Sequence, residues 1–128
     1  MTSSAQREMR PAIAPDPALL DAMAAAPDHH RVVLENDQVR VLDTRLAAGE
    51  STPLDEHRWP AVLHVLSWSD FVRVDAHGNV LLDSRAAGMS AKPGDILWGS
   101  PLPPHSVRNV GARDLHILAI EIKQPLPP

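Results

Sequence analysis

Two histidines of this chain follow turn-forming segments and are candidate metal ligands. His105 comes after Pro103 and Pro104, which fix their own φ angles and leave the backbone little freedom where it reaches the imidazole. His57 ends a second such unit, GESTPLDEH, at residues 49–57. Histidine is the commonest metal ligand in proteins, so these two units favour a metal centre. The alternative is that both histidines belong to surface turns and have no function.

Length and composition predict one small domain. The chain has 128 residues, 44% of them hydrophobic, which is enough for a single core and too little for two domains. It has no cysteine, which excludes disulfides, thiol nucleophiles and thiolate zinc sites and agrees with a reducing compartment. The first ten residues, MTSSAQREMR, lack the apolar run of a secretory signal. No segment approaches the ~20 apolar residues of a membrane span, and we expect a cytoplasmic protein.

The distribution of charge argues against nucleic acid and against an anionic membrane as partners. The net charge is −4, and the basic residues are scattered singly without forming a stripe that could neutralise phosphates. The expected partners are therefore a small-molecule ligand and a second copy of the chain in a homodimer.

The N-terminal part differs in pattern from the rest. Residues 1–15 carry little hydrophobic pattern and are expected to form a flexible arm. Asp16 and Pro17 are typical of a helix start, and apolar residues at helical spacing follow until Pro27. The sequence thus predicts a short helix over residues 16–26 at the beginning of one domain that spans residues 16–128.

From Arg31 onward, short apolar runs alternate with turn residues about every eight to twelve positions, which is typical of an all-β barrel or sandwich. No helical segment interrupts these runs, so a parallel βαβ sheet is excluded. The expected strands are residues 32–35, 39–46, 53–57, 61–66, 71–75, 80–83, 89–91, 96–98, 105–110 and 115–123. The histidines at positions 29, 30 and 77 fall in predicted turns and are expected to be exposed.

Over residues 31–123 the sequence resembles a small single-domain cupin, a member of the β-barrel family with the motifs G-x5-H-x-H-x3,4-E-x6-G and G-x5-P-x-G-x2-H-x3-N. The second motif is taken by Gly94, Pro101, Pro103, His105 and Asn109, with Pro103 where the inner glycine would fall. The resemblance implies an all-β fold, an antiparallel cupin-type β-barrel of the double-stranded β-helix or jelly-roll kind.

The first motif is degenerate. Gly49 takes the opening glycine, Asp55 stands where the first histidine is expected, and His57 takes the second. Ala61 replaces the glutamate, and the closing glycine is missing. Two of the four usual metal ligands of the family are therefore present unchanged.

The residues that remain still predict a metal site. Asp55 and His57 are two positions apart, so on a strand they share one face. With His105 from an opposite strand they supply two imidazoles and one carboxylate, the composition of the facial triad of non-haem Fe(II). The same donors also accept Mn, Ni, Co or Zn. In the alternative interpretation the barrel is degenerate, Asp55 is a solvated rim charge and the histidines are merely hydrogen-bonded.

Four further residues are predicted to contact a ligand. Trp59 and Trp98 lie near strand ends around the proposed site and could give it an apolar wall, although tryptophan is more often a core or dimer contact. Arg58 and Arg108 neighbour the motif residues and could bind a carboxylate, although most such arginines are surface charges.

Three functions agree with these features. The first is a divalent-metal-dependent cupin enzyme that acts on a small organic metabolite, as a dioxygenase or as an isomerase or lyase. The second is a metal-free barrel that binds a small molecule. The third is a structural dimer in which an edge strand near residues 31–46 pairs with a second copy.

Overall fold

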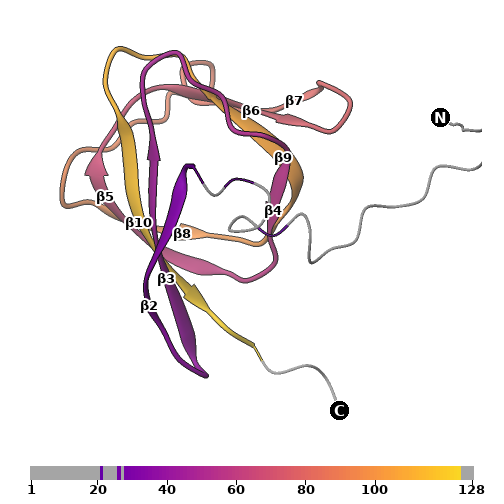
Figure 1. The fold of residues 1–128 in the computed structure, drawn as a ribbon. Coiled ribbons are helices and arrows are strands. Elements are labelled where there is room, and N and C mark those ends of the chain that lie inside the picture. Colours follow the sequence, from indigo (N-terminus) through magenta and orange to yellow (C-terminus); the bar gives the residue numbers. More distant parts are fainter. Residues whose placement is uncertain (1–20, 22–25, 27, 125–128) are drawn as a thin grey trace, which may run out of the picture.

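The computed structural model describes residues 21, 26 and 28–124, which form nine antiparallel strands in two sheets (Figure 1). The five-stranded sheet contains, in spatial order, β2 (His30–Glu35), β3 (Val39–Leu46), β10 (Leu115–Ile122), β5 (Ala61–Ser67) and β8 (Ile96–Gly99). The four-stranded sheet contains β4 (Asp55–His57), β9 (Leu102–Asn109), β6 (Phe71–Asp75) and β7 (Val80–Asp83). The predicted all-β antiparallel architecture is confirmed.

The strand pattern of the sequence is largely confirmed as well, with one wrong segment. Residues 89–91 were expected to be a strand, but they pair with no other described strand. The reason is local, because the backbone N–H of Met89 donates to the carbonyl of Ser84 and closes a turn over residues 84–88. Met89 then contributes its side chain to the interior cavity.

The predicted arm at residues 1–15 lies outside the described residues, and so does most of the predicted helix at residues 16–26. Two positions of that helix are described, Asp21 and Ala26. Asp21 forms an isolated parallel bridge with Glu56 of β4. Within the described part of the chain no helix has the length and apolar character that crossing a membrane requires.

Strands β3 and β10 form the centre of the larger sheet. Their register pairs Leu42 with Ala119 and Arg40 with Glu121, and all four side chains are buried. Paired residues of an antiparallel ladder lie on the same face, so one apolar pair and one charged pair point inward side by side. Leu42 and Ala119 pack with Ala61 in the core.

The ladder between β4 and β9 contains a bulge. Asp55 is paired with His105 and His57 with Leu102, so Glu56 alone stands opposite Pro103 and Pro104. The sequence predicted a turn at these prolines, whereas strand β9 already begins at Leu102. Proline has no N–H to donate to a ladder, and a bulge is one of the few positions where a strand tolerates it. Bulges also redirect side chains, and here Leu102 and His105 both face the interior although they are three residues apart.

Asn109, the last residue of the second motif, holds the end of β9 in place. Its side chain is fully buried, and Nδ2 donates to the carbonyls of Leu46 and Arg113 at 2.9 and 2.7 Å. Oδ1 accepts from Oγ of Ser69 at 2.7 Å and from the backbone N–H of Gly111 at 3.0 Å. Because every donor and acceptor of the amide is used, Asn109 ties β9 to β3 and to two loops.

A cavity of about 500 Å³ lies between the two sheets. The five-stranded sheet contributes Thr44, Ala61, Leu63, Leu97, Ile117, Ala119 and Glu121 to its lining, and the four-stranded sheet contributes His57, Arg73, Leu82, Leu102, His105 and Val107. The two histidines that the sequence singled out therefore open into one interior space.

Candidate metal centre

Strands β4 and β9 bring Asp55, His57 and His105 together. Each residue offers one ligand atom, and these atoms lie within 4.8 Å of one another. Asp55 and His57 are two positions apart on β4 and share its inner face, while His105 is the register partner of Asp55 on β9. The two turn-plus-histidine units of the sequence thus meet through a direct strand pairing.

The hydrogen bond of His105 determines which ring nitrogen faces the cluster. Nδ1 lies 2.7 Å from the carbonyl oxygen of Pro103, which can only accept, so Nδ1 carries the proton. Burial lowers the pKa of His105 to about 4, so the ring is neutral near pH 7. Nε2 therefore presents a lone pair toward Oδ1 of Asp55, 3.4 Å away.

A buried carboxylate fixes His57 in the same way. Nδ1 of His57 lies 3.1 Å from Oε2 of Glu121 on β10. Burial raises the pKa of Glu121, but hydrogen bonds from His57 and Arg40 outweigh burial and lower it overall. Glu121 is thus an ionised acceptor, Nδ1 of His57 donates to it, and Nε2 is turned toward Asp55 at 3.9 Å. Metal-ligating histidines usually donate their other N–H to a carboxylate or a carbonyl, and these two histidines use one of each.

Asp55 is a buried carboxylate with an oxygen atom that has no hydrogen-bond partner among the described residues. It is 1% exposed, and its Oδ1 has no hydrogen-bond partner among the residues that the structure describes. Burial raises its pKa to about 6, although the charge of His57 acts in the opposite direction. One carboxylate oxygen and two imidazole lone pairs therefore converge without a hydrogen between them. A buried polar atom of this kind calls for an ion or a proton, and two nitrogens and one oxygen fit a divalent transition metal.

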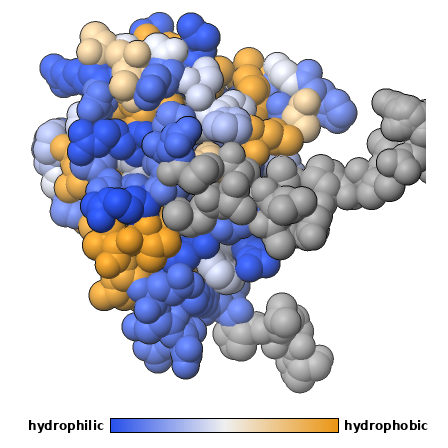
Figure 2. Space-filling view, viewed as in Figure 1, coloured by the Kyte–Doolittle hydropathy of each residue, from blue (hydrophilic) through white to orange (hydrophobic). Residues whose placement is uncertain are grey.

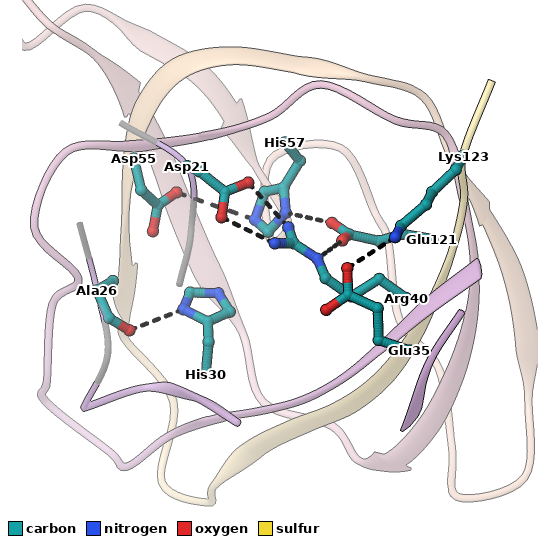
Figure 3. Close-up of polar contacts among 9 residues, drawn as sticks. All are labelled: Asp21, Ala26, His30, Glu35, Arg40, Asp55, His57, Glu121 and Lys123. Atoms are coloured by element: carbon teal, nitrogen blue, oxygen red, sulfur yellow. Dashed lines mark hydrogen bonds and ion pairs between the residues drawn. The ribbon is translucent and has the colours of Figure 1, made fainter. Parts of the chain in front are cut away.

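A series of charged hydrogen bonds connects His57 to Glu121, Arg40 and Asp21 (Figure 3). Nε of Arg40 donates to Oε1 of Glu121 at 2.7 Å, and its terminal nitrogens donate to both oxygens of Asp21 at 2.8 and 2.9 Å. Burial lowers the pKa of Arg40, but these hydrogen bonds outweigh burial and raise it overall. The interactions run from Asp21 through Arg40 and Glu121 to His57, so they hold the imidazole in one orientation.

A third histidine lies beside the cluster. His30 was expected in an exposed turn, but it is 5% exposed, and its ring centroid lies 5.5 Å from that of His57. Nδ1 lies 2.9 Å from the carbonyl oxygen of Ala26, and burial lowers the pKa of His30 to about 4. His30 is therefore neutral, and it closes one side of the site without adding charge.

The four predicted ligand contacts fall into two groups. Trp59 and Trp98 line the cavity, and Trp98 is 61% exposed at its opening. Arg58 is exposed and its guanidinium lies 4.9 Å from the ring centroid of Trp59, while Arg108 is exposed on the outer face of β9. The arginine that lines the cavity is Arg73 of β6.

The sequence matches no protein-family model and no curated protein. Several solved structures are similar. A cupin domain from Bordetella pertussis superposes with a TM-score of 0.56 at 19% identity, over 74% of this chain and 92% of that chain. An RmlC-like cupin from Methanocaldococcus jannaschii gives 0.51 at 12% identity, over 73% and 77%.

The polyketide cyclase RemF from Streptomyces resistomycificus gives a TM-score of 0.51 at 16% identity, over 93% of this chain and 83% of that chain. At these identities the likeness concerns the fold. The resemblance noted in the sequence is thereby confirmed for the architecture, and the chain is a small protein of the cupin fold, the double-stranded β-helix.

Proposed function

We propose that this protein is a divalent-metal-dependent enzyme that acts on a small organic metabolite, with Asp55, His57 and His105 as the metal ligands. The observation that carries the proposal is the buried Oδ1 of Asp55, which lacks a hydrogen-bond partner among the described residues and faces Nε2 of both histidines. Fe, Mn, Ni and Zn all accept this set of donors.

The side chains of the site would have two roles, metal binding and orientation of the ligating imidazoles. Asp55, His57 and His105 would hold the ion, and Glu121 and the Pro103 carbonyl would keep the two imidazoles in the ligating tautomer. Three protein ligands leave coordination positions open, as catalytic sites do. A metal bound there supplies either an oxygen-binding centre, for a dioxygenase, or a Lewis acid, for an isomerase or lyase.

The cavity suits a small substrate. Its volume of about 500 Å³ lies in the usual range of small-molecule sites, and apolar residues make up most of its lining. Trp59 and Trp98 would form an apolar wall, and His57 and His105 would present the ion to the same space. Each imidazole keeps its proton on Nδ1, directed toward Glu121 or the Pro103 carbonyl, which leaves Nε2 free to bind the ion.

Elemental analysis tests the proposal. Protein purified without added metal should contain close to one ion per chain, and His57→Ala or His105→Ala should lose it. His77→Ala is the matched control, because His77 is exposed in the turn between β6 and β7. Traces of metal that neither substitution changes would reject the metal centre and leave the metal-free binding barrel as the better explanation.

A homodimer is the second candidate, and one surface feature favours it. Strand β2 is an edge of the five-stranded sheet, and Val33 and Leu34 on it are 51% and 50% exposed. Figure 2 shows a face that is mostly hydrophilic and interrupted by hydrophobic patches. Exposed apolar residues on an unpaired edge favour pairing with another chain. Sedimentation should show a dimer that Val33→Lys weakens, and a monomer at micromolar concentration would argue against it.

A further inference from the structure

Arg73 faces the cavity as a result of the strand register. It is paired with Val107 of β9 and with Leu82 of β7, and both of these residues line the cavity. Residues paired across antiparallel strands point to the same side of the sheet. Two positions further along the ladder, His105 occupies the same inner face of β9. Arg73 and the metal cluster therefore open into one space from neighbouring positions of the smaller sheet.

The positive charge of Arg73 has no anionic partner among the described residues. Its Nε is buried without a hydrogen bond, and among residues 21, 26 and 28–124 no carboxylate forms an ion pair with it. The guanidinium lies over the ring of Phe71, whose centroid is 5.6 Å from the guanidinium carbon. Burial lowers the pKa of Arg73. A partly buried charge without a counterion is unfavourable for folding, and a bound anion would offset this cost.

Two acids on the same strand or in the same cavity lining are already engaged. Asp75, two positions along β6, accepts hydrogen bonds from the backbone N–H groups of His77 and Asn79 and from the side chain of Asn79. Glu121, the acid that lines the cavity, is bound by Arg40 and His57. Neither carboxylate is available to neutralise the guanidinium. The ion pairs of Asp55 are with His57 and His105 and not with Arg73, so an anion from outside the chain would supply the missing charge.

We propose that Arg73 binds the carboxylate of a small organic acid whose apolar part occupies the cavity between the two sheets. This deepens the proposed function, on which it rests, by naming the substrate class. Arginine matches a carboxylate with two parallel hydrogen bonds. The rest of the lining is predominantly apolar and suits a hydrocarbon body, with contributions from Leu63, Leu82, Leu97 and Ile117.

The test uses the full chain treated with EDTA, so that a carboxylate cannot bind through a metal. The probes are butyrate, hexanoate and benzoate, each compared with its neutral amide, and the readouts are thermal shift and calorimetric titration. At least one acid should raise the melting temperature, and its amide should not. Arg73→Met should weaken binding of that acid by about tenfold or more, because hydrogen bonds to charged groups contribute at least that much. Arg73→Lys should retain part of the affinity for that acid.

Two further measurements separate a binding role from a packing role. Arg73→Met without ligand should melt at the same or a higher temperature than the wild type, because it removes an uncompensated charge; a packing role predicts a lower temperature. Arg108→Met, on the outer face of β9, should keep the full response to the acids. The proposal is overturned if every acid behaves like its amide, or if Arg73→Met responds as the wild type does.

These measurements distinguish failure of the carboxylate site from failure of the metal centre. If acids bind through Arg73 but the purified protein contains no metal, the metal-dependent function fails and the carboxylate site stands. If the protein contains metal that depends on His57 and His105 but no acid binds in the presence of EDTA, the Arg73 proposal fails alone.

Discussion

Oδ1 of Asp55 and Nε2 of His105 lie 3.4 Å apart across the first ladder pair of β4 and β9, and the imidazole proton is on the far side of the ring. Two acceptors at this distance repel each other unless a cation or a proton lies between them. The bulge at Pro103 and Pro104 places His105 opposite Asp55, and the Pro103 carbonyl holds its ring. The bulge and the hydrogen bond of His105 therefore both direct Nε2 of His105 toward Oδ1 of Asp55.

Asp55→Asn should abolish metal binding without unfolding the protein. The amide has nearly the shape of the acid but no charge, and its N–H can donate to Nε2 of His105, so the repulsion disappears. We expect the metal content to fall to background while the melting temperature of the metal-free protein stays equal or rises. Elemental analysis and a thermal melt in EDTA check both points. Retention of a full complement of metal would show that Asp55 is not a ligand.

Glu121→Gln should weaken the metal site through His57. Outer-shell partners of ligating histidines typically contribute 10- to 100-fold to metal affinity, so competition with a chelator should show a loss of about that size. The variant also removes one ionic partner of Arg40 and should lower the free energy of unfolding by about 2 kcal/mol. Glu35→Gln is the control, since Glu35 pairs with Lys123 at the surface and is exposed. Equal effects of the two variants would contradict a positioning role for Glu121.

The metal-free protein should lose stability between about pH 6 and pH 4.5. His30 and His105 have folded pKa values of about 4, below their ordinary value, so in this range the unfolded chain binds two protons that the folded chain does not. Asp55, with a folded pKa of about 6, binds one proton in the folded chain only. The unfolded state therefore binds one proton more, and the free energy of unfolding should fall by up to about 1.4 kcal/mol per pH unit.

Urea midpoints in EDTA measure this slope. Asp55→Asn removes the opposing contribution and should make the decline about twice as steep over the same range. A stability that is constant, or that increases as the pH falls from 6 to 4.5, would show that the histidines are not buried in the neutral form.

Asn109→Asp should destabilise the fold by about 2 kcal/mol or more. The substitution replaces the two donors that reach Leu46 and Arg113 with a charged acceptor, which would face both carbonyls in a fully buried position. Chemical unfolding gives the loss. Metal content per folded chain should stay as in the wild type, because Asn109 makes its hydrogen bonds to loops and to β3. A selective loss of metal would instead place Asn109 in the site.

Local pattern predicted most of the strands and placed Asp55 and His57 on one face, and the family resemblance pointed to His105 as the third member of the cluster. Asp55 and His57 share a face because of the two-residue period of a strand, which holds in any β fold. The separation between Leu102 and His105 breaks that period, because the bulge absorbs one residue. Such a departure depends on the partner strand, so the start of β9 was misplaced.

The supporting charges could not be located from the sequence because they depend on register. Arg40 and Glu121 are 81 positions apart and meet only because β3 and β10 pair as they do. A signal was present nonetheless. Glu121 shares its strand face with Ile117 and Ala119, and an acid on such an apolar face must have a partner if it is buried. Among the arginines, proximity to the motifs favoured Arg58 and Arg108, whereas strand alternation places Arg73 on the face of buried Phe71.

The positions of the tryptophans allow ligand binding to be followed by intrinsic fluorescence. Trp59 and Trp98 line the cavity, so a ligand that enters should alter their emission. Trp68 packs edge-on against Phe71, with ring centroids 5.7 Å apart. It supplies a background signal. Because the chain has no tyrosine, its ultraviolet fluorescence comes almost entirely from indole, and occupancy of the barrel can be followed without a label.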